Sequence, residues 1–272
     1  MADPLAEADV ACDPMVYVAK VSSSDEDIWI TREGRAARLT GSDVVDVNPA
    51  ISRDGLRIAF TSGPGDQENL DLVLMNTDGS NRVIVWAGDT IQSSVDWSPD
   101  GETLVFDQFG PDHALQIYTI PSDGSSQPTQ LTAGEPNGKP TYSPDGGSIL
   151  FLSLRDGESQ EIYSMTSAGA DPVNLTHSPS RDVLAEMSPD GSQIAFASDR
   201  TGDFEIWLMN ADGSDPIRLT SNPGDDSNPT WSSDGNHILF TSQLEPVGIW
   251  AMQRDGSNPA PIVKNGWAPD CP

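Results

Sequence analysis

Five oxygen-bearing side chains recur along the chain at nearly equal spacing. They are Asp46, Gln92, Asn137, Asp182 and Asp226, separated by 46, 45, 45 and 44 residues. Carboxylate and amide oxygens are the ligands of a hard cation such as Ca²⁺, which accepts six to eight of them, waters included. If the chain repeats one structural unit with this period, the five would form a ring able to hold Ca²⁺, with Asp43, Asp89 and Asp225 as further ligands. The alternative is polar loop residues that hydrogen-bond to the turn backbone.

A longer motif with the same period must position these residues. In each copy the end of one strand meets an Asp-Gly turn, and an apolar strand follows; the glycine can take the positive φ that such a turn needs. The copies are Asn48–Phe60, Ser94–Phe106, Lys139–Phe151, Leu184–Phe196 and Asn228–Phe240. The turn aspartates are Asp54, Asp100, Asp145, Asp190 and Asp234. A fixed period of this length with several strands per repeat is typical of a propeller or a solenoid.

Each full repeat has the pattern of four strands. The first strands end at Ile51, Trp97, Tyr142, Met187 and Trp231, and Trp267 is a sixth if Trp267–Asp270 is matched to Trp97–Asp100. The first repeat has three strands, Met15–Val21, Asp27–Thr31 and Ala36–Thr40, so the C-terminal strand should complete it. In this alignment the sixth ring position is Ile262. We predict an all-β, six-bladed β-propeller of four-stranded blades over residues 15–272, after an acidic leader at 1–14. The C-terminal strand would close it by joining the N-terminal blade, leaving no long sheet edge unpaired.

The consensus resembles one known family. Ser-Pro-Asp-Gly followed by Ile-Ala-Phe, then an Ile-Trp or Ile-Tyr strand, an Asp-Gly turn and Leu-Thr, is similar to the TolB-type six-bladed propeller repeat, or PD40. The resemblance covers about residues 15–271. It implies the fold but no single activity, since similar propellers occur in periplasmic TolB, in prolyl-oligopeptidase-like peptidases and in some lyases.

The two cysteines, Cys12 and Cys271, lie near the two ends of the chain. Cys12 precedes Val16 by four residues, as Asp54 precedes Ile58, and Cys271 takes the place of Gly101. Both should therefore lie at one turn of the closing blade, where we expect a disulfide; two free thiols or a metal site are the alternatives. A disulfide indicates an oxidising compartment, such as the periplasm or the medium.

The formal net charge is −28, with 42 acidic and 14 basic residues. Such a surface repels nucleic acid and anionic lipid, so both are excluded as partners. The aspartates could serve turns, a surface suited to salt, or divalent cations. Residues 1–14 contain neither a basic nor an apolar stretch, so we expect a cytosolic protein or a mature one without its signal. Together with the disulfide this predicts a periplasmic or secreted protein that does not insert into a membrane.

Catalytic motifs are absent from the sequence. It contains no Gly-x-Ser-x-Gly and no His-Glu-x-x-His, and the histidines fall at different phases of the repeat. We therefore expect a monomeric, non-catalytic binding or scaffold propeller whose partner is a protein or peptide docked over one tunnel mouth, where loops converge. Ca²⁺ held by the ring would stabilise it. The alternative is a lyase or hydrolase acting on a glycan or peptide, with carboxylates at the mouth as acid and base.

Overall fold

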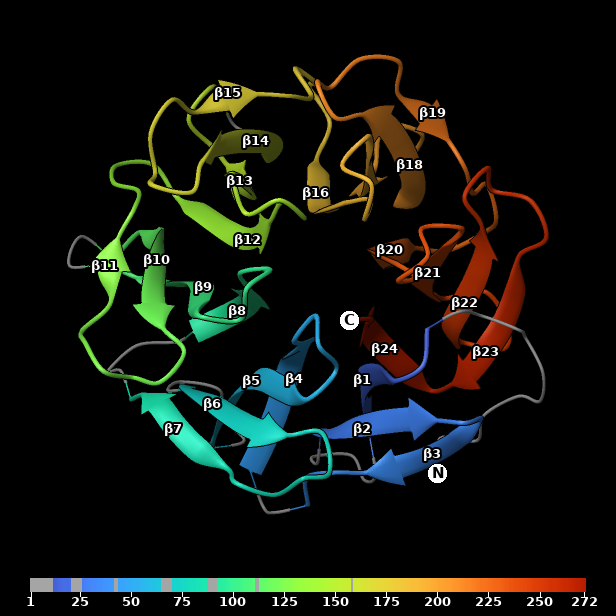
Figure 1. Ribbon diagram of the computed structural model, residues 1–272. Helices are drawn as coiled ribbons and strands as arrows, with labels where there is room; N and C mark the ends of the chain where they lie inside the picture. The colour runs from blue at the N-terminus through green and yellow to red at the C-terminus, as the bar shows by residue number, and fades with distance from the viewer. Residues whose placement is uncertain are drawn as a thin grey trace.

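The computed structural model describes residues 12–20, 26–41, 44–64, 70–87, 92–110, 113–157 and 159–272. In these residues the backbone forms strands and no helix, and the strands make six four-stranded antiparallel sheets. The sheets stand around a central axis as the blades of a ring (Figure 1). The predicted all-β, six-bladed propeller is confirmed.

The blades are numbered from the N-terminus, and their strands run from the centre outward. Blade 1 contains β24 (Gly266–Asp270), β1 (Met15–Lys20), β2 (Glu26–Arg32) and β3 (Arg35–Arg38). Blade 2 contains β4 (Val44–Ile51), β5 (Arg57–Pro64), β6 (Asp71–Asn76) and β7 (Val83–Trp86). Blade 3 contains β8 (Gln92–Trp97), β9 (Thr103–Phe109), β10 (Leu115–Pro121) and β11 (Thr129–Gln130).

The other three blades follow the same order. Blade 4 contains β12 (Asn137–Tyr142), β13 (Ser148–Ser153), β14 (Glu161–Thr166) and β15 (Val173–Asn174). Blade 5 contains β16 (Asp182–Met187), β17 (Gln193–Ser198), β18 (Glu205–Asn210) and β19 (Ile217–Arg218). Blade 6 contains β20 (Asp226–Trp231), β21 (His237–Ser242), β22 (Gly248–Gln253) and β23 (Ala260–Lys264).

The ring closes as predicted, because β24 pairs antiparallel with β1 (Figure 1). The predicted register of β24 is wrong. Asp270 lies opposite Val16 and therefore corresponds to Glu186, which lies opposite Ala195 in blade 5. It does not correspond to Asp100.

Three further assignments change with this register. Cys271 corresponds to Met187 and not to Gly101, Trp267 is not a first-strand end, and the sixth ring position is Gly266 and not Ile262. The offset is four residues, because Cys271, and not Trp267, takes the position of Trp97. In blade 3 the Trp-Ser-Pro-Asp sequence runs from the end of β8 into the turn, whereas Trp267–Asp270 lies within β24, so this short match does not fix the register.

The core lies within and between the blades. The second strand of each blade contributes one aromatic side chain that is fully buried; these are Tyr17, Phe60, Phe106, Phe151, Phe196 and Phe240. Trp97 and Trp231 lie between neighbouring blades. Their Nε1 atoms donate to main-chain oxygens of the preceding blade, Ala50 O at 3.0 Å and Glu186 O at 3.2 Å.

The Asp-Gly turns explain many of the aspartates. In the turn after each of five first strands, a serine hydroxyl donates to the aspartate two residues later at 2.6–2.7 Å, and the glycine has φ between 68° and 71°. These hydrogen bonds hold the pKa of Asp54, Asp100, Asp145 and Asp234 below its usual value. The turn explanation for the abundance of aspartate is therefore supported at these positions.

The first prediction concerns the packing between blades. Trp231 is 2% exposed, so Trp231→Ala should lower the free energy of unfolding by about 3–5 kcal/mol through the lost contacts and the cavity left behind. Urea unfolding measures this. Ile217→Ala is the matched control, because Ile217 is 52% exposed and its truncation should change stability by less than about 0.5 kcal/mol. Equal losses in the two variants would contradict the assigned packing.

The predicted disulfide is also present. Cys12 and Cys271 are bonded, with their Cα atoms 5.6 Å apart and a sequence separation of 259. In the chain-entropy model a loop of this length stabilises the fold by roughly 5 kcal/mol. Reductant should therefore lower the melting temperature strongly while the β signal in circular dichroism persists below it. Cys271→Ser should melt at the lower temperature with or without reductant; a further drop in that variant on reduction would show that reductant acts elsewhere.

Candidate functional site

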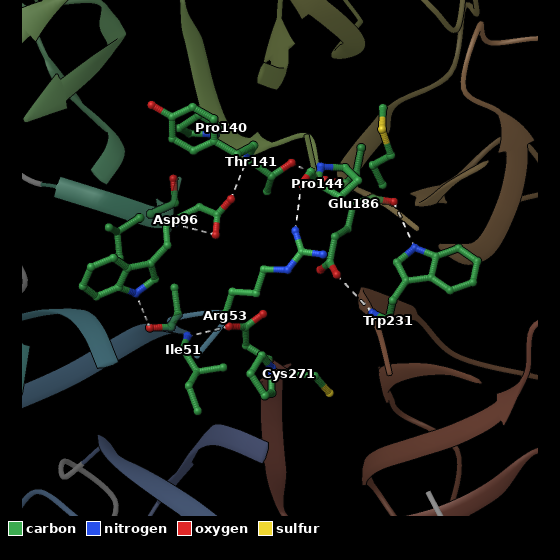
Figure 2. Close-up of a pocket in the computed structure, with 18 of the residues that line it drawn as sticks. Ile51, Arg53, Asp96, Pro140, Thr141, Pro144, Glu186, Trp231 and Cys271 are labelled. Carbon is green, nitrogen blue, oxygen red and sulfur yellow. Dashed lines mark hydrogen bonds between the residues drawn. The ribbon is translucent and has the colours of Figure 1, made fainter. Parts of the chain in front are cut away.

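A central funnel lies where the first strands of the blades meet. Its volume is about 400 Å³, and first-strand residues of all six blades line it. It opens on the side of the Ser-x-Asp-Gly turns, where Ser98, Pro99, Ser143, Pro144 and Pro189 form part of the wall. Figure 2 shows this region.

Bulges in the first strands aim side chains into the funnel. The pairing shifts between Val47 and Ala50 in β4, and at the equivalent step of the other first strands. In five blades a residue at this step has positive φ, between 49° and 56°; these are Asn48, Lys139, Leu184, Asn228 and Ala268. Such bulges bend a strand and redirect the residues that follow.

Three carboxylates face the funnel, and they come from alternate blades. Asp270, Asp96 and Glu186 occupy equivalent positions in blades 1, 3 and 5. The same position holds Ala50, Thr141 and Thr230 in blades 2, 4 and 6. We call Asp96, Glu186 and Asp270 the funnel carboxylates.

Each funnel carboxylate accepts a hydrogen bond from the backbone of the next blade. Ile51 N donates to Asp270 at 2.7 Å, and Tyr142 N donates to Asp96 at 2.7 Å. Trp231 N donates to Glu186 at 3.1 Å. These bonds join blades 1 and 2, 3 and 4, and 5 and 6, and they fix the carboxylates in position.

The funnel carboxylates hold protons more strongly than ordinary acids. Burial raises the pKa of Asp96 to about 6. Burial, with the charge of Asp96 added, raises the pKa of Asp270 to about 8. Burial also raises the pKa of Glu186 well above its usual value, and the charges of Asp270 and Asp96 raise it further. The group therefore favours a proton or an external positive charge near neutral pH.

The remaining wall is largely apolar, with Ile51, Val95 and Met187 among its residues. The exposed Arg53 side chain crosses the funnel from blade 2, and its Nη1 donates to Pro144 O of blade 4 at 2.8 Å. In Figure 2 it extends between Asp96 and Glu186. An apolar wall with a few fixed polar groups is the usual composition of a ligand pocket.

The five predicted metal ligands lie at the starts of first strands, outside the funnel lining. Asp46 pairs with Arg82 at 2.8 Å, Asp182 with Arg200 at 2.9 Å, and Asn137 accepts from Arg155 at 2.9 Å. Gln92 and Asp226 are fully buried. Within the described residues no three His, Cys, Asp or Glu side chains converge as a metal centre. A metal role for the five stays a prediction, and Asp43 and Asp89 lie outside the described residues.

Sequence reasoning missed the funnel carboxylates, although a signal for them exists. Asp96 and Glu186 each directly precede the residue at which a first strand ends, Trp97 and Met187. Asp270 precedes Cys271 in the same way once β24 is aligned through its pairing with β1. An acidic residue at one fixed phase of every second repeat would have identified them.

Fold and funnel define a closed six-bladed propeller with an acidic central pocket. The sequence matches the PD40 family model, described as the TolB beta propeller domain, over residues 15–188 and 185–268. The chain belongs to this TolB beta propeller family.

Solved structures agree with the family assignment. TolB from Acinetobacter baumannii has a TM-score of 0.81 at 20% identity, covering 95% of this chain and 66% of that one, so this chain spans slightly less than two thirds of its length. A putative TolB from Agrobacterium tumefaciens has a TM-score of 0.74 at 25% identity, covering 94% and 91%. An oligogalacturonate lyase in complex with manganese has a TM-score of 0.62 at 16% identity, covering 93% and 74%, and shows the fold alone.

No curated protein sequence matches the chain. Within the residues that the structure describes, no helix is long and apolar enough to cross a membrane.

The funnel carboxylates predict how stability depends on pH. Their pKa values are raised in the folded state, so between about pH 4 and pH 8 the folded protein binds more protons than the unfolded chain. Their contribution to stability is therefore complete at low pH and lost as the pH rises through the folded pKa values. The melting temperature should fall from pH 5 to pH 9.

Asp270→Asn tests the assignment, since the amide oxygen can still accept from Ile51 N without a charge. This variant should show a smaller fall and should melt above the unaltered protein at pH 9. Asp145→Asn, in an exposed turn, is the control and should keep the full fall. Parallel curves for the Asp270→Asn variant and the unaltered protein would contradict the assignment.

Proposed function

We propose that this protein is a non-catalytic, extracytoplasmic binding module that holds a segment of a partner protein or peptide in its central funnel. The observation that carries the proposal is the funnel itself, a hollow of about 400 Å³ with apolar walls and three fixed carboxylates. Membership of the TolB beta propeller family supports a binding or scaffold role.

The walls of the funnel are held in place before any ligand arrives. Its carboxylates are bonded to the neighbouring blade, and the closing strand is tied by the Cys12–Cys271 disulfide. A preformed pocket lowers the ordering cost of association. A short segment can therefore bind by side chains that enter the funnel, with little change in the propeller.

The chemistry of the pocket describes the segment that fits. An apolar side chain can pack against Ile51 and Met187, and an ammonium, guanidinium or N–H group can face the funnel carboxylates. Arg53 must move or share the mouth, and its single bond to Pro144 O makes that displacement easy. A cation bound beside these carboxylates would lower their pKa values and release protons.

The disulfide supports a location outside the cytoplasm, because disulfides persist in oxidising compartments. We place the protein in the periplasm or the medium, as a monomer whose open funnel mouth meets the partner.

The proposal can be tested with a displayed library of random peptides selected on the immobilised protein. Selected peptides, made synthetically, should bind the unaltered protein in calorimetry, share a basic and an apolar position, and lose at least tenfold affinity for Ser233→Trp. Ser233 is exposed at the rim of the funnel, so an indole there covers it.

Ser125→Trp is the matched control, because Ser125 is exposed on an outer turn away from the funnel. It should bind like the unaltered protein. Peptides that bind both variants equally, or a library that yields no funnel-dependent peptide, would contradict the proposal. Turnover of a glycan or peptide panel that is lost in Ser233→Trp would favour the lyase or hydrolase alternative.

A further inference from the structure

A cluster of polar side chains recurs where one blade meets the next, away from the funnel. An acid or amide lies at or next to the start of the third strand of one blade, and a threonine follows that blade's fourth strand. A second acid or amide lies at or near the start of the first strand of the next blade. We call this a junction cluster. The described clusters are Asp27, Thr40 and Asp46; Gln116, Thr132 and Asn137; Glu161, Thr176 and Asp182; and Glu205, Thr220 and Asp226.

The threonine is bonded in the same way in every one of these clusters. Its Oγ1 accepts from the backbone N of the isoleucine that follows the first acid or amide, at 2.9–3.1 Å. Its hydroxyl donates to that acid or amide at 2.6–3.2 Å. The threonine proton is therefore committed, and it is not free for the side chain on the next blade.

Arginine completes the first three of these clusters. Arg38 Nη2 lies 2.7 Å from Asp27 as an ion pair outside hydrogen-bond geometry, and Arg82 pairs with Asp46 at 2.8 Å. Arg155 donates to Asn137 at 2.9 Å. Arg200 donates to both carboxylate oxygens of Asp182 at 2.9 Å. The positive charge offsets the cost of burying the carboxylates.

The cluster between blades 5 and 6 has no such arginine. Arg155 and Arg200 stand two residues after the serines paired with Asn137 and Asp182, and the residue at the equivalent place after Ser242 is Leu244. Arg200 stacks over Phe196 and Trp207, and Leu244 packs against the core that contains the equivalent Phe240 and Trp250. Leu244 thus keeps the apolar contact of an arginine stem and supplies no charge.

Two buried oxygens in this cluster have no hydrogen-bond donor. Asp226 is 0% exposed; its Oδ2 accepts from Asn222 Nδ2 at 2.8 Å, while its Oδ1 and Asn222 Oδ1 are unpartnered. The Ser242 hydroxyl accepts from Leu244 N and lies beside the Asp226 carboxylate, so it can donate its one proton to that carboxylate once. A buried carboxylate oxygen without a partner is strongly unfavourable.

The charge around these oxygens is also uncompensated. Glu205 is 5% exposed and lies beside Asp226, so the cluster buries two carboxyl groups, and Asp225 is a third nearby. Neither Glu205 nor Asp226 has an ion-pair partner within the described residues. The exposed Arg218 acts on Glu205 only through its charge, without an ion-pair contact. Two carboxyl groups and several oxygens match a divalent hard cation.

We propose that the junction between blades 5 and 6 binds one Ca²⁺, which takes the role that arginine has in the sister junctions. Asp226 Oδ1 and Asn222 Oδ1 are the primary ligands, and Glu205, nearby hydroxyls and water complete the oxygen shell that Ca²⁺ prefers. Full burial of Asp226 favours a small ion over a basic side chain from a partner. The half-buried Asn222 gives the ion a path from solvent. This site is separate from the funnel and does not depend on the proposed function.

The test begins with protein freed of metal by a chelator. Calorimetric titration with CaCl₂ should show one site per chain, and Ca²⁺ should raise the melting temperature more than NaCl at matched ionic strength. Screening of the −28 charge responds to ionic strength alone, whereas a site responds to the identity of the ion. Equal shifts with the two salts would overturn the proposal.

Two variants locate the ion. Asp226→Asn should abolish Ca²⁺ binding in calorimetry and reduce the Ca²⁺ shift to that of matched NaCl. Leu244→Arg restores the arginine of blades 4 and 5; it should melt higher than the unaltered protein without Ca²⁺ and should lose the Ca²⁺ site. The Leu244→Arg result decides the question if Asp226→Asn does not fold.

Asp145→Asn removes the same charge from an exposed turn and should keep full Ca²⁺ binding. Ca²⁺ binding that survives in Leu244→Arg, or that is weakened equally by Asp145→Asn, would place the ion elsewhere and overturn the proposal.

Discussion

Closure of the ring by β24 is the constraint on which the funnel depends. Blades 2 to 6 are built from consecutive strands, whereas blade 1 takes its innermost strand from the far end of the chain. Pairing with β1 places Asp270 level with Asp96 and Glu186, so the same strand that removes the open sheet edge also supplies the third funnel carboxylate. The Cys12–Cys271 disulfide fixes this arrangement covalently.

The scarce basic residues act mainly inside the fold. Arg57, Arg155, Arg200 and Arg254 lie over aromatic rings of the blades, and Arg82 and Arg200 neutralise buried carboxylates. Aspartates meanwhile occupy exposed turns, where serine and backbone donors satisfy them. Several arginines thus make internal contacts while aspartates lie at exposed turns, so much of the formal net charge of −28 is presented at the surface. Such a surface favours partners that bring positive charge.

The period of the sequence was enough to predict the number of blades, the closing strand and the disulfide, because these follow from which residues repeat. The register of β24 was not predictable from the match at Trp267, since Trp267–Asp270 lies within a strand whereas Trp97–Asp100 runs into a turn, and the two are four residues out of register. The same offset hid Asp270. The junction clusters also required the structure. The Leu-Thr pairs are visible in the sequence, but the sequence does not show that Thr220 donates to Glu205 or that Asp226 lacks an arginine partner, because these contacts form only in the folded ring. Periodicity records shared positions, and functional sites arise where one copy departs from the others.

The alternation of the funnel carboxylates gives the pocket a lower symmetry than the backbone around it. The scaffold is nearly sixfold, yet its acidic groups repeat only at every second blade, so the pattern of charge is nearly threefold. Arg53 reaches across from blade 2 alone and removes the remaining rotational equivalence. A ligand in the funnel therefore has one preferred rotational setting about the axis. A funnel built from repeated units thus selects the orientation of its ligand as an asymmetric pocket does.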